Sequence, residues 1–443
     1  MSEAKFRQIA DTITTQIIEG RYPAGTKLPT HREMATELAT TPATVAKAYK
    51  LLTDLNKVES FVGRGTFVCG GSHLASVIRA EEKSDEFNFS ILQPCLVHNA
   101  TALQQAYSQA RWDVSLLGYS EQSGHQTHRQ NGAKWAQAYG LDHANQDNIL
   151  LTNGAQHALS LIVETLTQPG DTIAVEALTY PGILAIASLS GRRIVAVEMD
   201  ADGMRADSLS HILAEHQPKL VVVVPSHHNP TCITMPIHRR EAIAKVVQAS
   251  SAWLVEDDIY GFLNPEPISA ISNWIPQQSF HITSLSKAIS PAMRCGFLKV
   301  PDHYIDTLST HIRATIWMAS PLNYVVASDL IQSGEAFAMA EKQKALAVQR
   351  QTLAKQILGT DTQGTGYHIW LPLPDGWQQD KLVIEAKKQG ILISSGGYFT
   401  ADQHDSQYVR LALTTIATEK KFEQGLQKLR VLLDNPTRVN FPV

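Results

Sequence analysis

The chain has 443 residues, which is too long for one ordinary domain and indicates two or three. Hydrophobic residues make up 44% of the chain and charged residues 18%, so large cores can form and wholesale disorder is excluded. The net charge of −4 argues against a protein whose whole surface binds nucleic acid.

Targeting and redox signals predict a cytoplasmic protein. No apolar run reaches the roughly 18 residues of a membrane span, and the N-terminus lacks a signal-peptide pattern. None of the four cysteines lies in a CxxC pair, so we expect reduced thiols. We therefore expect no membrane partner.

The first part of the chain carries three helix signals. Isoleucines spaced four apart in residues 9–17 give one apolar stripe. Thr30 and Glu33 form a capping box that starts a second helix, because each side chain can bond the backbone of the other. Thr41 can cap a third helix, and Pro42 suits its first position. The short turn between the last two helices is typical of a helix-turn-helix.

A hairpin follows these helices. Residues 57–68 alternate like two strands, with Gly63 and Arg64 in the turn. Residues 1–70 contain nine Lys or Arg and seven Asp or Glu, a net charge of +2, while the rest of the chain has a net charge of −6. A basic N-terminal region, here called the head (residues 1–70), on an otherwise acidic chain suits DNA binding. The helix and strand periodicity alone would also fit any small helical domain with a hairpin.

The amino-acid sequence of the head favours a DNA-binding domain over an unrelated small helical domain. The stretches GRYPAGTKLPTHREMA, TPATVAKAYKLL and GRGTFV resemble the GntR family of winged-helix repressors. The resemblance implies that the helix beginning at Thr41 enters the major groove of double-stranded DNA. The residues that it implies as DNA contacts are Arg32, Thr41, Thr44, Lys47, Gly63 and Arg64. One departure is that Pro42-Ala43 stand before Thr44, where the family usually has an arginine.

Residues 71–86 read as a linker, and residues 87–443 as a separate α/β body. Short apolar segments alternate with helical ones, which predicts a mainly parallel sheet covered on both faces. The expected strands are 149–152, 171–175, 220–224, 253–255 and 281–283, and the expected helices include 159–166 and 239–248. Ligands of such sheets bind beyond the carboxyl ends of the strands.

Four segments at those strand ends carry chemistry. Gly154 opens a helix after a strand, where backbone N–H groups can bind an anion. Asn229 lies in an Asn-Pro turn, and the neighbouring histidines point apart, so we predict no metal site there. Acids at 256–258 are costly to bury without a cationic partner, although a structural salt-bridge cluster would also explain them. Lys287 follows small hydroxyl residues, where a lowered pKa would favour Schiff-base chemistry.

This ordered series resembles the aspartate aminotransferase superfamily of fold-type-I pyridoxal-phosphate (PLP) proteins, from about Tyr119 to Arg410. The resemblance implies that Lys287 forms the Schiff base and that Asp257 pairs with the ring nitrogen. It also implies that Tyr260 and Asn229 bind the phenolic oxygen of the ring.

The same resemblance assigns the remaining contacts. Tyr180 would stack on the ring, and Arg410, in YVRLAL, would bind a ligand carboxylate. The phosphate would be held by Gly154, Ala155, Gln156, Ser284, Ser286 and Arg294, with Ala155 contributing only its backbone. The body should therefore have the seven-stranded sheet of that fold and a smaller C-terminal α+β subdomain.

Head and body together resemble the MocR-type regulators of the GntR family. That resemblance implies a swapped head-to-tail homodimer whose effector is PLP, or PLP with an amino compound. A ligand amine would displace Lys287 from the cofactor, and the domains would then shift the two heads on their DNA half-sites. Two alternatives stay open: a working aminotransferase with a secondary head, and a PLP sensor without amine chemistry.

Overall fold

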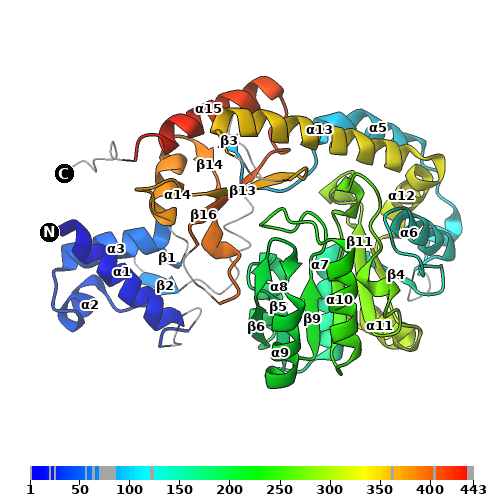
Figure 1. Cartoon of the computed structure of the whole chain (residues 1–443), viewed down its shortest axis with the longest axis horizontal. Coiled ribbons are helices and arrows are strands. Elements are labelled where there is room, and N and C mark those ends of the chain that lie inside the picture. Colours follow the sequence, from blue (N-terminus) through cyan, green and yellow to red (C-terminus); the bar gives the residue numbers. More distant parts are fainter. Residues whose placement is uncertain are drawn as a thin grey trace. The chain divides into compact units, whose positions relative to one another are not determined.

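The structure is a computed structural model, and it forms two compact units, Met1–Arg79 and Ala80–Val443 (Figure 1). It describes residues 2–18, 21–23, 26–54, 57–61, 65–68, 86–119, 124–360, 364–402 and 406–436. The predicted linker 71–86 lies outside these residues except for Glu86, so the three-part division of the chain stays a prediction. No helix in the described part is long and apolar enough to span a membrane.

The first unit contains the three predicted helices and the hairpin. Its elements are α1 (Ser2–Ile18), α2 (His31–Glu37), α3 (Pro42–Asp54), β1 (Val58–Phe61) and β2 (Gly65–Val68). The capping box is confirmed, because Thr30 N donates to Glu33 Oε2 at 2.7 Å and Glu33 N donates to Thr30 Oγ1 at 3.3 Å. The turn with Gly63 and Arg64 lies outside the described residues.

The apolar stripes of these helices meet in one small core. The side chains of Ile13 on α1 and of Val45 and Leu52 on α3 are all fully buried. The isoleucine periodicity predicted this for Ile13. The antiparallel hairpin gains a third extended segment, since Leu28 N donates to Thr66 O at 2.8 Å. Helices plus a small sheet give the winged helix expected from the sequence.

The second unit is built around a seven-stranded sheet with the order β4-β12-β11-β10-β9-β5-β6. Its strands are β4 (Ile149–Asn153), β5 (Thr172–Glu176), β6 (Arg193–Val197), β9 (Leu220–Val223), β10 (Trp253–Asp257), β11 (Ser279–Ser284) and β12 (Cys295–Lys299). All five predicted strands are present within one or two residues of their expected ends. β12 runs antiparallel to both neighbours, and the other pairs are parallel.

Helices cover both faces of this sheet. The alternation of side chains along the strands sends Val222 and Val255 into one core and Val221 and Leu254 into the other. The helices of this region and of the segment before it are α5 (Leu96–Gln109), α6 (Gln126–Ala138), α7 (Ala155–Leu166), α8 (Pro181–Leu189), α9 (Ala206–His216), α10 (Ile237–Gln248), α11 (Ile305–Thr315) and α12 (Pro321–Ser333). A short β7 (Met199–Asp200) and β8 (Gly203–Met204) form a separate pair.

A smaller α+β subdomain follows, as predicted. It contains α13 (Glu335–Leu358), β13 (His368–Pro372), α14 (Gln379–Lys388), β14 (Ile391–Leu392), β15 (Ser394–Ser395), β16 (Tyr408–Ala412) and α15 (Glu419–Leu433). Its own core gathers side chains from these helices and strands. The start of the second unit returns here, because β3 (Phe87–Asn88) pairs in parallel with β14.

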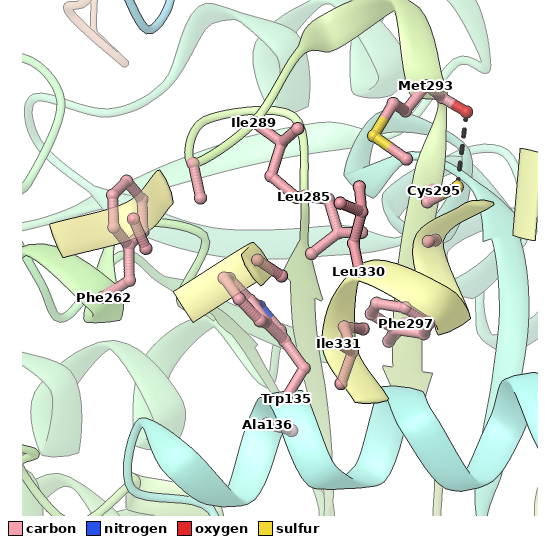
Figure 2. Packing of buried hydrophobic residues seen from close by; sticks show 14 of the residues in the cluster. Trp135, Ala136, Phe262, Leu285, Ile289, Met293, Cys295, Phe297, Leu330 and Ile331 are labelled. Atoms are coloured by element: carbon pink, nitrogen blue, oxygen red, sulfur yellow. Dashed lines mark hydrogen bonds between the residues drawn. The ribbon is translucent and has the colours of Figure 1, made fainter. Parts of the chain in front are cut away.

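A further core of the second unit supports the chain around Lys287. Leu285 and Ile289, on either side of it, are fully buried among side chains that include Trp135, Phe297 and Leu330 (Figure 2). Ile289 N donates to Leu285 O at 2.8 Å, which closes one helical turn between them. The lysine is therefore carried by a turn that is anchored on both sides.

Candidate functional site

The predicted site residues gather at one edge of the sheet. Gly154 follows β4, Tyr180 lies beyond β5, Asn229 beyond β9, Asp257 ends β10 and Lys287 follows β11. These strands are parallel, so their carboxyl ends share an edge. The sequence placed these residues correctly relative to the fold.

The surroundings of Lys287 lower the pKa of its amino group. It is partly buried, Nζ lies 6.0 Å from the centre of the Tyr260 ring, and Nζ donates to Leu92 O at 2.6 Å. Desolvation, assisted by the positive charge of Arg410, lowers the pKa of Lys287 to about 8, and Asp257 opposes this shift. A neutral amine, which is the nucleophile for an aldehyde, is thus accessible near neutral pH.

Asp257 is a buried carboxylate whose Oδ1 has no hydrogen-bond partner within the described structure. Burial, followed by the nearby charge of Asp258, raises the pKa of Asp257 to about 7, while Lys287 lowers it. An unpaired buried carboxylate is costly unless a cation or donor faces it. The site therefore fits a group that brings a protonated ring nitrogen to Asp257.

The other two acids of that run have different surroundings. Glu256 accepts hydrogen bonds from Ile271 N at 2.8 Å and from Ser272 N at 2.9 Å. Burial raises the pKa of Asp258, while Arg240 and His281 oppose this shift. Ligand atoms of Glu256, Asp258 and His281 lie within 4.8 Å of one another, with Arg240 supplying positive charge beside them. Hydrogen bonds to Glu256 and nearby positive charge at Asp258 thus favour a structural role for these two acids, and the cofactor explanation fits Asp257.

The anion-binding end lies where α7 begins. Gly154 is the N-cap of α7 with φ +78°, and a Cβ there would lie only 2.6 Å from Arg294 Nη2. The exposed Arg294 reaches back to donate to Asn153 O at 2.8 Å. Ser286 Oγ has no partner among the described residues, and Ser284 Oγ accepts from Ser286 N at 3.3 Å. A helix N-terminus, a guanidinium and a free hydroxyl suit a phosphate.

Two further phosphate candidates and the stacking tyrosine lie beside this end. Ala155 and Gln156 form the first turn of α7, and Gln156 Nε2 donates to Gly182 O at 3.3 Å. Tyr180 lies at the N-terminus of α8, with its ring against Gly182. Burial, followed by the charge of Asp257, raises the pKa of Tyr180 to about 12, so the phenol stays neutral.

Arg410 is almost fully buried on β16 and completes the opposite end of the site. Its guanidinium donates to Asn229 Oδ1 at 3.0 Å, to Ser394 Oγ at 3.0 Å and to Ser90 O. It lies 4.9 Å from the centre of the Phe399 ring. Burial lowers the pKa of Arg410 to about 10, so the group keeps its positive charge at neutral pH.

Four residues at this site were not predicted from the sequence. Ser90 and Leu92 contribute backbone carbonyls, which no motif reveals, and Ser394 is a serine in an ordinary strand. Tyr367 OH donates to Lys287 O at 2.7 Å and its ring packs edge-on against Tyr260. All four come from segments outside the strand-end motifs, so spacing could not indicate them.

On the first unit, the DNA contact candidates fall into three groups. Arg32, Thr41 and Lys47 are exposed, as phosphate or base contacts must be. Thr44 is half-buried, and its Oγ1 lies 2.8 Å from Thr41 Oγ1 at the start of α3. Gly63 and Arg64 lie outside the described residues.

Family comparison divides the chain in the same way as the structure. Residues 85–429 match the family "aminotransferase class I and II", and residues 5–68 match "bacterial regulatory proteins, gntR family". The first match covers most of the chain.

Individual relatives agree with both matches. The uncharacterized HTH-type transcriptional regulator YdeF of Bacillus subtilis is 28% identical over 98% of this chain and 95% of that protein. The uncharacterized HTH-type transcriptional regulator YdfD of the same organism is 25% identical over 97% and 96%. The fold of the body resembles LysN, the alpha-aminoadipate aminotransferase of Thermus thermophilus, with a TM-score of 0.73 at 21% identity, covering 83% of this chain and 97% of that one.

Proposed function

The chain belongs to the aminotransferase class I and II family and carries a GntR-family head, and on that premise we propose that it is a PLP-dependent regulator of transcription. The family implies PLP as cofactor, and the GntR head implies binding to DNA. The body would sense PLP itself or an amino compound and control a nearby operon. The observation that carries this proposal is that one chain joins a GntR-family head to an aminotransferase-family body in which the residues predicted to bind the cofactor gather around Lys287.

The residues at the ring end have distinct tasks in this proposal. PLP supplies, when bound, an aldehyde that reacts with amines and a protonated ring that withdraws electrons. Lys287 provides the amine that holds the cofactor, and Asp257 keeps the proton on the ring nitrogen. Tyr260 and Asn229 donate to the phenolic oxygen, while Tyr180 covers one face of the ring.

The two ends of the site hold the two anions. Arg294 binds the phosphate together with the start of α7 and nearby hydroxyls; these partners are Gly154, Ala155, Gln156, Ser284 and Ser286. Arg410 is buried and positively charged, so it would bind a ligand carboxylate as a two-pronged donor. A ligand amine would take the place of Lys287, and only a ligand that favours one domain arrangement could then alter DNA binding.

A homodimer is part of this proposal, and an exposed apolar patch on the body supports it. The members of this patch are exposed side chains of the segments 112–119 and 317–322, which the contact of Tyr119 with Trp317 joins: Trp112, Val114, Leu117, Tyr119, Trp317 and Leu322. Tyr119 and Trp317 pack against each other with ring centres 5.1 Å apart, and 82% of Val114 is exposed. Patches of this kind on a monomer mark protein interfaces. The head of each chain would then lie against the body of its partner, in the cytoplasm.

A working aminotransferase is the second candidate, because every side chain named above would also serve transamination. The two functions separate on turnover and on DNA. The regulator should bind its own upstream DNA specifically and form keto acid slowly or not at all from any amino acid in a panel. Steady keto-acid production at metabolic rates without specific DNA binding would favour the enzyme. A cofactor spectrum that no amine alters would favour a sensor of PLP alone.

A further inference from the structure

The segment 86–95, which we call the strap, crosses the site between Lys287 and Arg410. Its residues form β3 and the stretch that follows, and Ser90 and Leu92 are buried. Ser90 O accepts from Arg410 and Leu92 O accepts from Lys287 Nζ. Two residues of one backbone segment are thus bound to the two groups that the proposed cofactor and ligand must use.

Further side-chain donors to the strap carbonyls come from the small subdomain. Thr414 Oγ1 donates to Gln93 O at 2.5 Å, and Thr415 Oγ1 donates to Ile91 O. Ser394 Oγ also donates to Ser90 O, at 3.1 Å. Pairing with β14 holds the earlier residues of the strap. Among the side-chain donors to these carbonyls in the described structure, Lys287 is the one that follows a strand of the seven-stranded sheet.

We propose that the Lys287–Leu92 hydrogen bond is a clasp that ties the strap to the sheet and that cofactor attachment opens it. The proposal rests on the proposed function and names how occupancy of that site is passed on. Lys287 Nζ, as a free ammonium, has three N–H donors. If Nζ lost its protons, added to the aldehyde carbon of PLP and formed C=N with release of one water, at most one N–H would remain. That N–H would bond the phenolic oxygen of the cofactor, so Leu92 O would lose its donor.

A ligand amine reverses this change. When the nitrogen of the ligand takes over the aldehyde carbon, Nζ leaves as a free amine, regains a proton and can again donate to Leu92 O. The clasp is therefore closed in the free protein, open with PLP alone, and closed with PLP and an amine. In the sequence, the strap borders the predicted linker 71–86, so this difference between occupied states arises at the start of the body.

Hydrogen exchange of the strap amides in the full-length protein tests this order. The three samples are free protein, protein with PLP, and protein with PLP and aminooxyacetate, which reacts with aldehydes and carries a carboxylate for Arg410. We expect PLP to speed exchange in peptides covering 86–95 by about tenfold or more, as suits the loss of a hydrogen bond to a charged group. Aminooxyacetate should restore slow exchange.

Two substitutions at the same position provide matched controls. Lys287→Ala removes the donor, so the strap should exchange fast in all three samples. Lys287→Arg keeps a donor for Leu92 O without forming the covalent bond, so the strap should exchange slowly in all three. Circular dichroism would establish that both variants are folded, and each prediction stands without the other.

Different results would contradict the clasp and the proposed function. Unchanged strap exchange in the wild type, after the absorbance spectrum has shown that PLP is attached, would overturn the clasp and leave the regulator proposal intact. A strap that opens and closes as described while affinity for DNA ignores both PLP and amine would sustain the clasp and contradict the proposed function.

Discussion

Arg410 donates from Nη1 to Oδ1 of Asn229 at 3.0 Å, although 181 residues separate them in the chain. Asn229 is the expected partner of the ring oxygen, and Arg410 is the expected partner of a ligand carboxylate. The bond between them therefore joins the cofactor end of the site to the ligand end. Because the two residues have different expected partners, cofactor binding and ligand binding can be tested separately.

Replacing Arg410 should damage ligand binding more than cofactor binding. Arg410→Lys keeps a positive charge but loses the planar fork, and Arg410→Leu loses both. We expect the leucine variant to weaken binding of carboxylate-bearing amines by about 2 kcal/mol or more, which is roughly thirtyfold. Amines without a carboxylate provide the internal control in a spectral titration. Equal losses for both classes of amine would show that Arg410 does not read the carboxylate.

The lowered pKa of Lys287 predicts how cofactor attachment depends on pH. The neutral amine is the reactive form, so the attachment rate should rise up to pH 8 and then level off, following the pKa of about 8. Arg410 is one cause of the lowered value, so Arg410→Leu should move the plateau to higher pH. Stopped-flow absorbance after mixing with PLP measures both profiles. A rate that stays constant from about pH 6 to 9 would contradict the assignment.

Asp257→Asn should have opposite effects on the free and the cofactor-bound protein. Burial raises the pKa of Asp257 from 3.8 to about 7, so the carboxylate lowers stability as the pH rises between these values. The neutral amide avoids this cost. The stability gained on substitution should therefore be larger at pH 8 than at pH 5.5, by on the order of 1–2 kcal/mol.

The same variant should lose affinity for PLP, because no negative charge remains to face the ring nitrogen. Denaturant unfolding of the free protein at the two pH values and a PLP titration measure the two halves of this prediction. Asp257→Asn that binds PLP as tightly as the wild type would contradict the proposed role of Asp257, whatever its effect on stability.

Lys47 on the exposed face of α3 should contribute to DNA affinity through a phosphate. Lys47→Ala should weaken binding about equally for specific and unrelated duplexes and reduce the slope of log K against log salt by about 1. Lys342→Ala, an exposed lysine on α13 of the body, is the matched control and should change neither. Fluorescence anisotropy over a salt series supplies the slopes. An unchanged slope for Lys47→Ala would remove this residue from the interface.

The sequence predicted a helix or strand correctly where one short segment contains all the residues that specify it. The capping box at Thr30 and the apolar stripe of α1 involve residues three or four apart, so periodicity and capping chemistry specify them. The strands β5, β9 and β10 each contain a buried apolar run and were found for the same reason. In contrast, β12 reads as a short mixed run after Arg294, and its antiparallel placement depends on neighbours far away in the chain.

The residues of the candidate site likewise fall into those that local sequence indicates and those that only the tertiary structure reveals. Lys287, Asp257 and Arg410 stand in recognisable local contexts, so the resemblance named them. Ser90 and Leu92 act through backbone carbonyls, and every residue has one, so nothing in their side chains indicates the contact. The strap could be found only once the tertiary structure brought residues 86–95 against the end of the sheet.

Binding of the full-length protein to duplex DNA from its own upstream region, with and without PLP and an amine panel, tests the central claim most directly. Wild type and Lys287→Ala should be compared at the same salt concentration. We predict specific binding whose affinity or footprint changes with PLP, or with PLP and one amine class, in the wild type and not in Lys287→Ala. Specific binding that is the same for both proteins under every condition would contradict the account.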